Sequence, residues 1–492
     1  MAIQNLLDSL PAHSVLLTDG SHGLDRAALA DRIRQVGAAL EARARPRAPV
    51  GILADNSPEW LVVDLATQML GLTLVPLPLF FTPEQWMHVI AQSGIGALFC
   101  ADPAQGAALG FDRLVVGGGA LALCETRREP AAAVQGGVQK LTFTSGTTSA
   151  PKGVCLGTEQ QWEVARALRT GVAPLRLERH LCVLPFAVLL ENIAGPYTAL
   201  LSGAATICPP LQEVGMRGAS GFDAQACLDA IARYEAHSVT LVPQMLQAIV
   251  AASQPDDPRL RSLRFVAVGG GKMPPQLLAA ARALGLPVFE GYGLSECASV
   301  VALNLPGAQR DGSVGRPLAH RQVAIAADGE ILVQGCIARY LGQEAAPGDD
   351  GWLATGDLGH LDGDGFLFID GRKKDILITG FGRNVSPEWP EAVLTGTGAI
   401  AQAMVVGEAQ PWLGALLVPA GPGIDQAGLQ GAVDRANAQL PDYARIGRWQ
   451  AVPPFLPANG LLTPNGRLKR EAIRTQYASE IASLFTQPES NK

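Results

Sequence analysis

Small hydroxyl residues and a lysine crowd into one short segment, LTFTSGTTSAPKG at 141–153. Glycine and hydroxyl residues leave backbone N–H and O–H donors free to surround a phosphate chain, and a lysine adds fixed positive charge. The spacing differs from the nucleotide-triphosphatase loop GxxxxGK[ST], and a polar surface turn is the alternative interpretation. The candidate phosphate-binding residues are Thr144, Ser145, Gly146, Thr147, Thr148 and Lys152.

A second candidate segment, EGYGLSE at 290–296, follows a predicted strand. Gly291 and Gly293 let the backbone approach a ligand closely, and Tyr292 offers a flat face for a base. Glu296 offers the hard oxygen ligand that Mg²⁺ prefers. Cys297 occupies the last glycine position of a GxSxG elbow, which argues against a hydrolase of that type.

Asp357 and Arg372 flank the segment HLDGDGFLFID at 360–370, which is typical of a β-hairpin. A hairpin between them would bring both side chains to one polar group of a ligand, such as a ribose. Farther along, Pro-Asn-Gly at 464–466 predicts a turn that precedes the basic residues Arg467 and Lys469. The open question is whether this turn belongs to a solvated tail or reaches an active site.

The elements that must position these residues alternate between strand and helix over the first three hundred residues. VGILA at 50–54 is predicted as a buried strand, and the helix at 56–70 has Ser57 as N-cap with Pro58 in its first turn. This alternation indicates α/β layers with parallel sheets. Further predicted helices lie at 222–236 and 274–285, and further strands at 238–243, 264–268 and 180–190.

The pattern changes near residue 310. VAIAADGEILV at 323–333 reads as two strands around an Asp-Gly turn, which predicts another hairpin. The last 120 or so residues carry both helix and strand patterns and have the size of a separate domain. The predicted fold class is therefore α/β: a large N-terminal domain at 1–373 with layered α/β subdomains and a small β-barrel-like part, then an α+β domain at 374–492.

Composition narrows the class of protein. The chain has 492 residues, too many for one ordinary core, which predicts two or more domains. It is 48% hydrophobic and 17% charged, which indicates globular cores and excludes a disordered chain. The net charge of −7 argues against a nucleic-acid or anionic-membrane partner.

The cysteines carry no metal-binding spacing. None of the eight forms a CxxC pair, so we expect unpaired, buried small side chains in a reducing compartment. The N-terminal segment MAIQNLLDSL lacks the pattern of a signal peptide, and no apolar run reaches about 18 residues. The sequence therefore predicts a cytoplasmic protein without a transmembrane segment.

Taken together, these segments resemble the adenylate-forming superfamily of acyl-CoA synthetases, peptide-synthetase adenylation domains and luciferase-like ligases. TSGTTSAPKG resembles its phosphate loop, GYGLSE its adenine and magnesium motif, ATGD at 354–357 its ribose motif, and DGRKKD at 370–375 the segment that joins its two domains. The resemblance runs from about residue 15 to about residue 475, with the motifs in family order.

The resemblance implies a role for each matching residue. Thr144–Thr148 and Lys152 would hold the β- and γ-phosphates of ATP, and Glu296 would bind Mg²⁺. Asp357 would take the ribose hydroxyls beside Arg372. The other nucleotide contacts would come from Gly269, Gly270, Gly271, Glu290, Gly291, Tyr292 and Ser295.

The resemblance also implies a mobile C-terminal domain. It would rotate about a hinge at Lys374 between an adenylating pose and a thioester-forming pose. In the second pose GFGRNVSP at 380–387, with Gly380, Phe381 and Gly382, would line the tunnel for the thiol arm of CoA or of a carrier protein. The family's catalytic lysine falls on Arg467 by spacing, with Lys469 as the alternative.

The implied activity joins a carboxylic acid to a thiol in two steps. ATP and the acid would form acyl-AMP with release of pyrophosphate, and CoA would then displace AMP. Val188 stands where many members carry a histidine beside the acyl tunnel, so Val188 and Gly271 would border an apolar pocket that favours a fatty or other apolar acid. Two alternatives stay open: transfer to a carrier-protein phosphopantetheine thiol, and an adenylation-deficient binding or regulatory module, for which Arg467 is the only support.

Overall fold

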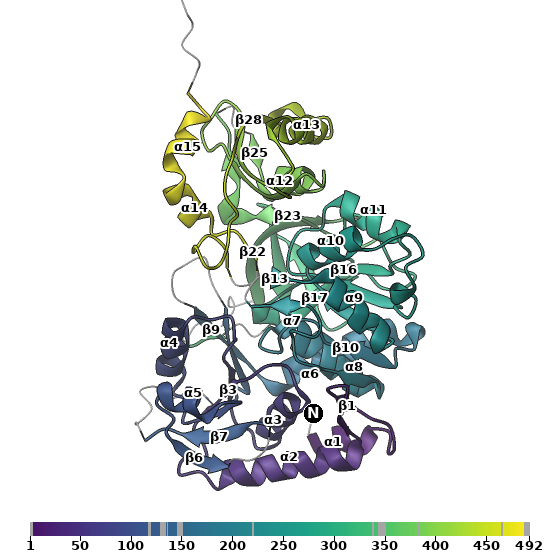
Figure 1. Cartoon of the computed structure of the whole chain (residues 1–492), viewed down its shortest axis with the longest axis vertical. Helices are drawn as coiled ribbons and strands as arrows, with labels where there is room; N and C mark the ends of the chain where they lie inside the picture. Colours follow the sequence, from purple (N-terminus) through teal and green to yellow (C-terminus); the bar gives the residue numbers. More distant parts are fainter. Residues whose placement is uncertain are drawn as a thin grey trace, which may run out of the picture.

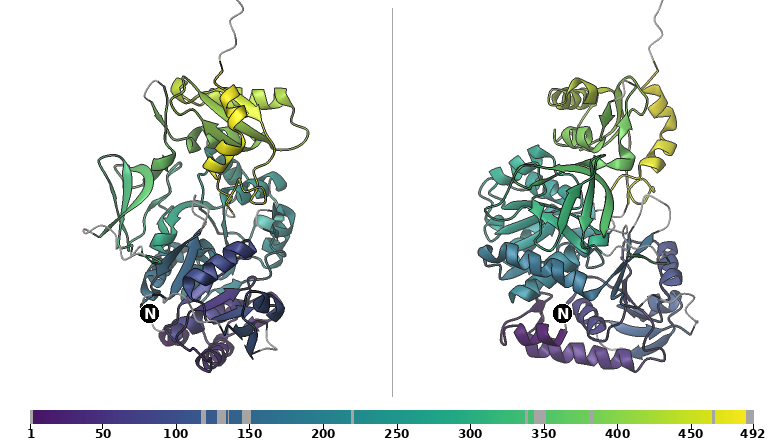
Figure 2. Two further views of the ribbon diagram at one scale, coloured as in Figure 1. Left: turned by 90° about the vertical axis from the view of Figure 1, so that its left-hand side faces the viewer. Right: turned by 180° about the vertical axis from the view of Figure 1, so that it is seen from behind.

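The structure is a computed structural model that describes residues 3–116, 120–127, 134, 136–144, 151–218, 221–336, 339–342, 351–380, 383–463 and 466–486. Helices α1 (Ile3–Ser9) and α2 (Arg26–Glu41) lie at one end of the molecule, and the elements that follow β23 (Leu367–Arg372) lie at the other (Figures 1 and 2). Within the described residues, no helix combines the length and apolar character needed to cross a bilayer.

The first large sheet takes most of its strands from the middle of the chain. Its order is β18-β17-β16-β15-β14-β10-β11-β1-β2, and β14, β15 and β16 are parallel neighbours, as their sequence pattern predicts. Its strands are β1 (Leu17–Thr18), β2 (Gly23–Leu24), β10 (Arg179–Leu181), β11 (Ala205–Ile207), β14 (Ser238–Leu241), β15 (Phe265–Val268), β16 (Val288–Leu294), β17 (Ser299–Leu303) and β18 (Arg316–Pro317).

The second large sheet carries the strands on either side of the hydroxyl-rich segment. Its order is β21-β9-β8-β4-β3-β5-β7-β6, with β3 parallel to β4 and β5, and β8 antiparallel to β9. Its strands are β3 (Val50–Leu53), β4 (Leu74–Pro76), β5 (Ala97–Cys100), β6 (Arg113–Val116), β7 (Ala122–Glu125), β8 (Lys140–Thr144), β9 (Lys152–Leu156) and β21 (Arg339–Tyr340).

Helices fill the space between the two sheets and cover their outer faces. One continuous apolar core joins Phe99 of the second sheet, Trp60 and Trp162 of the intervening helices, and Phe265 of the first sheet. Ser57 caps α3 by accepting from the Trp60 N–H, as predicted. The helices before residue 300 are α3 (Pro58–Met69), α4 (Pro83–Ser93), α5 (Pro103–Ala108), α6 (Thr158–Val172), α7 (Leu189–Asn192), α8 (Thr198–Ser202), α9 (Ala224–Arg233), α10 (Pro243–Ala252) and α11 (Pro275–Ala283).

The small β part is an antiparallel sheet in the order β19-β20-β22-β23. Its strands are β19 (Gln322–Ile325), β20 (Glu330–Gln334), β22 (Trp352–Leu361) and β23. Both predicted hairpins are confirmed, because β19 pairs with β20 and β22 pairs with β23. The predicted α/β fold class with a small β part is therefore correct.

The C-terminal part has a small sheet, β26-β27-β28, with helices on both faces. Alternate residues of β26 face opposite cores, so Ala403 and Val405 pack with α12 and α13 while Met404 and Val406 pack with α14. The boundary at 373/374 and the mobility of this part stay predictions. Its elements are β24 (Leu377–Ile378), β25 (Asn384–Val385), α12 (Glu388–Thr395), β26 (Ile400–Val406), β27 (Leu413–Pro419), α13 (Gln426–Asn437), β28 (Ile446–Ala451), α14 (Arg470–Gln476) and α15 (Ala478–Ser483).

Two sequence predictions are wrong. The strand predicted at 180–190 ends with β10 at Leu181, and α7 begins at Leu189. The Val183 and Leu184 N–H groups donate to the Glu191 carboxylate and not to a neighbouring strand, and Pro185 has no N–H to pair. The expectation that every cysteine is unpaired fails as well, since Cys297 and Cys336 form a disulfide. The other six cysteines are free and buried, as predicted.

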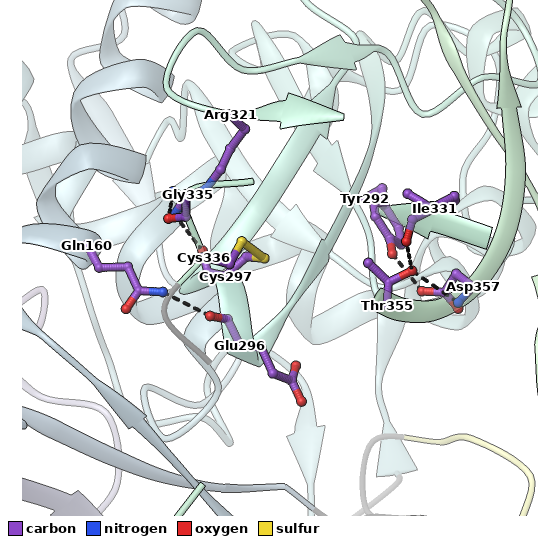
Figure 3. Close-up of a disulfide and its surroundings, with 10 residues drawn as sticks. All are labelled: Gln160, Tyr292, Glu296, Cys297, Arg321, Ile331, Gly335, Cys336, Thr355 and Asp357. Atoms are coloured by element: carbon purple, nitrogen blue, oxygen red, sulfur yellow. Dashed lines mark hydrogen bonds between the residues drawn. A yellow bond between two sulfur atoms is a disulfide. The ribbon is translucent and has the colours of Figure 1, made fainter. Parts of the chain in front are cut away.

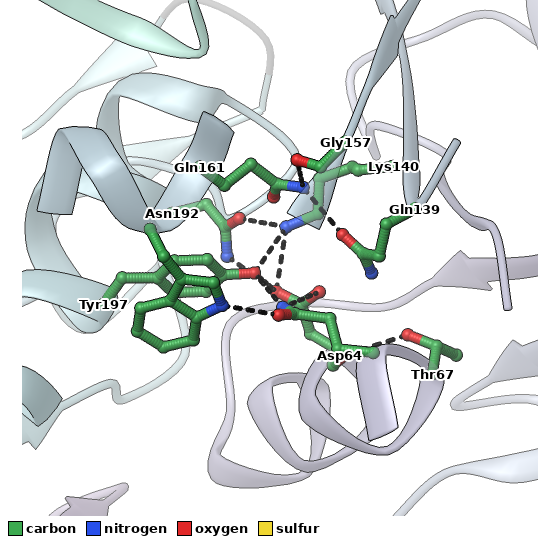
Figure 4. Close-up of polar contacts among 10 residues, drawn as sticks. Asp64, Thr67, Gln139, Lys140, Gly157, Gln161, Asn192 and Tyr197 are labelled. Atoms are coloured by element: carbon green, nitrogen blue, oxygen red, sulfur yellow. Dashed lines mark hydrogen bonds and ion pairs between the residues drawn. The ribbon is translucent and has the colours of Figure 1, made fainter. Parts of the chain in front are cut away.

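A buried ion pair links β8 of the second sheet to the helical segments packed against it (Figure 4). Lys140, on β8 of the second sheet, has its Nζ 2.9 Å from Asp64 Oδ2 of α3 and 3.0 Å from the Tyr197 hydroxyl. Asn192 Oδ1 accepts a third hydrogen bond from the same ammonium. Burial lowers the pKa of Lys140, and the Asp64 carboxylate opposes that shift. All three protons of the ammonium have acceptors, which offsets part of the cost of burying its charge.

We predict that Lys140→Met lowers the free energy of unfolding by about 3–5 kcal/mol, because it leaves the Asp64 carboxylate buried without its cation. Urea denaturation followed by circular dichroism measures the change. The double variant Lys140→Met/Asp64→Leu should recover most of the loss, since neither charge is then buried. A single variant as stable as the wild type would contradict the assigned role of the pair.

Candidate active site

Glycine-rich segments meet at the carboxyl ends of parallel strands β15 and β16. Val268 and Glu290 are register partners, so the loop 269–271 lies beside the start of the EGYGLSE segment. Gly270 has φ of +85°, which favours glycine. A Cβ at Gly293 would lie 1.8 Å from the Ser299 carbonyl oxygen, so the backbone of β17 excludes any larger residue there.

Asp357, Arg372 and Tyr292 form one polar cluster. Asp357 and Arg372 are direct register partners across the β22–β23 hairpin, and Arg372 Nε lies 2.9 Å from Asp357 Oδ1. The Tyr292 hydroxyl donates to the other carboxylate oxygen at 2.6 Å (Figure 3). The predicted meeting of Asp357 and Arg372 is confirmed as geometry. Tyr292 joins them because β16 ends beside the same hairpin.

Burial sets the electrostatics of this cluster. Desolvation raises the pKa of Asp357, and the Arg372 guanidinium opposes this shift. Desolvation and the Asp357 charge both raise the pKa of Tyr292. An uncharged phenol therefore faces a carboxylate held by an arginine, which is a hydrogen-bonding arrangement suited to the hydroxyls of a sugar.

Glu290, at the start of the same segment, is desolvated, and burial raises its pKa to about 8 while Lys272 opposes the shift. Lys272 is exposed, yet the surrounding protein desolvates its ammonium and lowers its pKa, and its Nζ donates to the Ile369 carbonyl oxygen at 3.2 Å. These two residues extend the charged cluster toward β23.

Glu296 lies on the single turn η4 (Ser295–Cys297). Its Oε1 accepts a hydrogen bond from the Tyr340 hydroxyl at 2.6 Å, and its backbone carbonyl accepts from Gln160 Nε2 at 2.9 Å. Among the described residues, Oε2 has no hydrogen-bond or ion-pair partner. A half-buried carboxylate with one oxygen held and the other available fits Mg²⁺, which prefers hard oxygen ligands.

The hydroxyl-rich segment connects adjacent antiparallel strands. Thr144 ends β8 and pairs with Lys152 at the start of β9, so both ends of the segment lie together, with Lys152 exposed beside them. Four predicted residues of the phosphate loop lie outside the described residues, as do two of the predicted tunnel residues: Ser145, Gly146, Thr147, Thr148, Phe381 and Gly382.

Arg467 reaches this site from the far end of the chain. Its Nε and Nη2 donate to the Gly270 carbonyl oxygen at 3.3 and 3.2 Å. The side chain keeps contact with solvent, yet the surrounding protein desolvates it and lowers its pKa, and Arg372 adds repulsion. Asp357 and Glu388 counter with negative charge. Arg467 is therefore a cation placed beside the glycine loop and the Asp357 cluster.

Local contacts shape the turn that carries Arg467. The Thr463 N–H donates to the Arg467 carbonyl at 2.7 Å, and Gly466 has φ of +76°. Arg470, which begins α14, makes a bidentate pair with Glu391 of α12, both bonds being 2.7 Å. The turn is thus clamped to the body of the C-terminal part.

Lys469 occupies a different place from Arg467. Its backbone N–H donates to the Leu461 carbonyl at 2.9 Å, just before α14 begins. Over the described part of the chain, no hydrogen bond or ion pair involves its side chain. Of the two candidate cations, the structure brings only Arg467 to the glycine loop.

Apolar side chains form the wall opposite the charged cluster. Leu190, Val242 and Pro243 lie close to the glycine loop, with side-chain atoms 3.6–4.0 Å from the Cβ positions of Gly269, Gly270 and Gly271. Val188 is the N-cap residue of α7, two positions before Leu190. The family resemblance singled out Val188 for the acyl pocket, which stays a prediction, and the structure places the Leu190 side chain against the loop.

The remaining predicted residues take positions near these elements. Lys374 lies in the turn η5 (Lys373–Asp375), directly after Arg372. Gly380 donates its N–H to the Gln410 carbonyl at 2.8 Å. Ser295 begins the turn that carries Glu296.

Sequence reasoning missed several residues of the site. Tyr340, Gln160 and Glu388 belong to no motif, and Lys272 directly follows the glycine loop. The only signal that could have found Lys272 was its position after three glycines at the end of a predicted strand. Nothing in the spacing points to the other three.

Comparisons with known proteins agree on one family. The AMP-binding enzyme family model matches residues 10–338, and the model of the AMP-binding enzyme C-terminal domain matches residues 374–489. An indoleacetate–CoA ligase of Aromatoleum aromaticum is 31% identical over 439 residues, which cover 80% of this chain and 82% of the relative. A long-chain-fatty-acid–CoA ligase of Mycobacterium bovis is 35% identical over 251 residues, but the match spans 45% of this chain and only 42% of that relative.

Solved structures share the fold. An anthranilate–CoA ligase in complex with anthranoyl-AMP has a TM-score of 0.81 at 21% identity and covers 98% of each chain. The o-succinylbenzoate–CoA synthetase of Bacillus subtilis, in complex with its acyl-adenylate, has a TM-score of 0.77 at 24% identity, covering 96% of this chain and 97% of the other.

The raised pKa of Glu290 generates a prediction about stability. Between pH 4.5 and about 8 the folded protein keeps a proton that the unfolded chain has lost, so this group makes stability fall as pH rises through that window. We expect Glu290→Gln to remove this part of the pH dependence. Urea unfolding midpoints of the wild type and the variant, measured at pH 5 and pH 8.5, test this prediction. An equal fall of the midpoint between the two pH values in both proteins would contradict it.

Proposed function

This chain belongs to the family of AMP-binding enzymes, and on that basis we propose that it activates an apolar carboxylic acid with ATP and transfers the acyl group to the thiol of CoA. The observation that carries the proposal is the position of Arg467. Its guanidinium bonds to Gly270, between the Asp357–Arg372–Tyr292 cluster and the apolar wall of Leu190, Val242 and Pro243. A cation there would meet both a nucleotide phosphate and a carboxylate.

In the first step a carboxylate oxygen attacks the α-phosphorus of ATP, and the bond to pyrophosphate breaks. Two anions must be brought together, so the protein contributes positioning and charge neutralisation. Asp357 would hold the ribose hydroxyls beside Arg372, and Tyr292 and the glycine loop would border the adenine. Ser295 would contact the α-phosphate, and the loop 144–148 with Lys152 would hold the leaving phosphates.

Glu296 would hold Mg²⁺, through the carboxylate oxygen that Tyr340 leaves available. The ion would neutralise charge on the phosphate oxygens. A solved relative of this fold, the o-succinylbenzoate–CoA synthetase of Bacillus subtilis, has been captured with ATP and a magnesium ion.

Arg467 would stand where the family uses a lysine. A guanidinium keeps the positive charge but presents a planar fork of donors in place of a compact ammonium. In the structure both donors point at the Gly270 carbonyl, so they would need to turn from that oxygen to the carboxylate and the α-phosphate. We propose that Arg467 stabilises the charge that develops between these two groups.

In the second step the CoA sulfur attacks the acyl carbon, the bond to AMP breaks, and the thiol proton is lost. The proposed route is a rotation of the C-terminal domain about Lys374, which brings the segment 380–387 to the site. The CoA ligases among the relatives favour CoA over a carrier protein as the acceptor.

The acid is proposed to be fatty or otherwise apolar because the side chains against the glycine loop are Leu190, Val242 and Pro243. A charged or amine-bearing substrate would find no partner on this wall. The names of the relatives cover acids as different as long-chain fatty acids, indoleacetate and 2-succinylbenzoate, so the proposal of an apolar class rests on the wall alone and leaves the length of the acid open.

Acid-dependent exchange of labelled pyrophosphate into ATP, measured over a panel of aliphatic and aryl acids, tests the adenylation step. Mass spectrometry of the products with CoA or with a phosphopantetheinylated carrier protein then identifies the acceptor. Exchange followed by acyl-CoA formation supports the proposal. If exchange occurs but the acyl group passes only to the carrier protein, the carrier protein and not CoA is the acceptor. If no acid supports exchange, a binding or regulatory module is favoured.

We predict that Arg467→Ala lowers the rate of pyrophosphate exchange by roughly 10²–10³-fold, because it removes a charge placed for the adenylation transition state. Thioester formation from supplied acyl-AMP should be kept, since that step does not use the group.

Lys469→Ala is the matched control, a cation two positions away that we expect to stay within about threefold of wild type, as a surface substitution does. If Lys469→Ala alone abolished exchange, the assignment of Arg467 would be wrong. Arg467→Lys, which restores the family residue, should keep most of the activity.

A further inference from the structure

The turn that carries Glu296 has an unusual backbone. Ala298 and Ser299 directly follow it with φ of +56° and +93°, a region that residues other than glycine adopt at a cost. The turn lies between the end of β16 and these two residues. It needs contacts with its surroundings to keep a single conformation. The described contacts show where that support comes from.

Two residues, one just before β21 and one on it, attach to this turn, and Figure 3 shows the first attachment, the disulfide. Cys336 forms a disulfide with Cys297, the residue next to Glu296, and both cysteines are buried. Tyr340 then donates its hydroxyl proton to Glu296 Oε1 at 2.6 Å. One attachment is covalent and acts on the backbone, and the other acts on the carboxylate itself.

Other contacts brace the same link. Arg321 Nη2 donates to the Cys297 carbonyl at 3.3 Å, and Arg321 Nη1 donates to the Gly335 carbonyl, so one guanidinium joins both sides of the disulfide. Gln160 of α6 holds the Glu296 carbonyl. The turn is thus fixed from α6, from Arg321 and from the disulfide at once.

Tyr340 also connects the turn to the phosphate side of the site. It lies on β21, where it pairs with Val154 of β9, the strand that begins with Lys152. A single residue therefore sets the distance between the strand that carries Lys152 and the carboxylate of Glu296. Those two groups would have to act on one phosphate chain.

From this geometry we propose that Tyr340 and the Cys297–Cys336 disulfide are the devices that position Glu296 for Mg²⁺-bound ATP, and that reducing the disulfide weakens this binding. Tyr340 fixes one carboxylate oxygen, and the other, which has no hydrogen-bond or ion-pair partner among the described residues, would hold the metal. The inference rests on the proposed role of Glu296 as the magnesium ligand. Hydrogen bonds that orient metal-binding carboxylates are commonly worth tenfold or more in metal affinity.

The redox step is an exchange with a small dithiol. One thiolate attacks a sulfur of the Cys297–Cys336 bond, and the second closes the reagent into a ring, which leaves two protein thiols and one cyclic disulfide. Two protons and two electrons pass from the reagent to the protein. No other oxidant or reductant takes part.

The experiment measures binding by calorimetry for two ligands, AMP without metal and the magnesium complex of a non-hydrolysable ATP analogue. We expect Tyr340→Phe and the dithiol-reduced wild type each to bind the magnesium complex about tenfold more weakly. AMP affinity should not change, because it depends on Asp357 and Tyr292. A thiol count by alkylation and mass spectrometry confirms that the disulfide was present and then reduced.

Tyr443→Phe is the matched control for the tyrosine, since Tyr443 is exposed and far along the chain, and Cys227→Ala is the control for the cysteines, since Cys227 is a free buried thiol. Cys336→Ala repeats the test without reagent, and melting curves exclude unfolding. Suppose that wild type binds both ligands, and that Tyr340→Phe, Cys336→Ala and the reduced protein bind the magnesium complex as tightly as wild type does. This inference is then overturned. If wild type binds neither ligand, the proposed function fails instead.

Discussion

A single buried lysine constrains how the large sheets of this protein can pack. Lys140 sits at the start of β8 with its ammonium between Asp64, Asn192 and Tyr197, and these partners come from the helices between the sheets. A charge in that position is tolerated only in the arrangement that satisfies all three of its protons. The strand that carries the lysine continues to Thr144, where the hydroxyl-rich segment begins. The position of Thr144, at the end of β8, therefore depends on a contact in the core.

The candidate site lies where the separate layers end. The loop 269–271 and Gly291 come from the first sheet, Lys152 from the second, Asp357 and Arg372 from the small β sheet, and Arg467 from the C-terminal part. Asp357 and Glu388 oppose the charge of Arg467, which Arg372 repels, while Glu290 keeps its proton below about pH 8 beside Lys272. The cluster therefore keeps positive charge beside the apolar side chain of Leu190.

Local chemistry made several parts of the structure predictable. Ser57 and Pro58 predicted the start of α3, and the hairpins around Asp328–Gly329 and 362–366 followed from turn residues. The meeting of Asp357 and Arg372 followed from the hairpin, because register partners lie opposite one another. The errors have different causes. The Val183 and Leu184 N–H groups bond to the Glu191 side chain where an apolar run predicted a strand, and the disulfide joins cysteines 39 residues apart whose spacing carries no signal of contact.

Propensity, hydrophobic period and turn chemistry act over a few neighbouring residues, so the printed chain was enough to predict the fold class, the order of the motifs and the residue types available to the site. The contact of Arg467, and not of Lys469, with the Gly270 carbonyl came from the tertiary structure, since two residues on one turn differ in direction and not in pattern. The tertiary structure also decided that Leu190 rather than Val188 lies on the glycine loop, and that Tyr340 and Cys336 support Glu296. These contacts join residues that are far apart in sequence, and packing alone sets which of them meet.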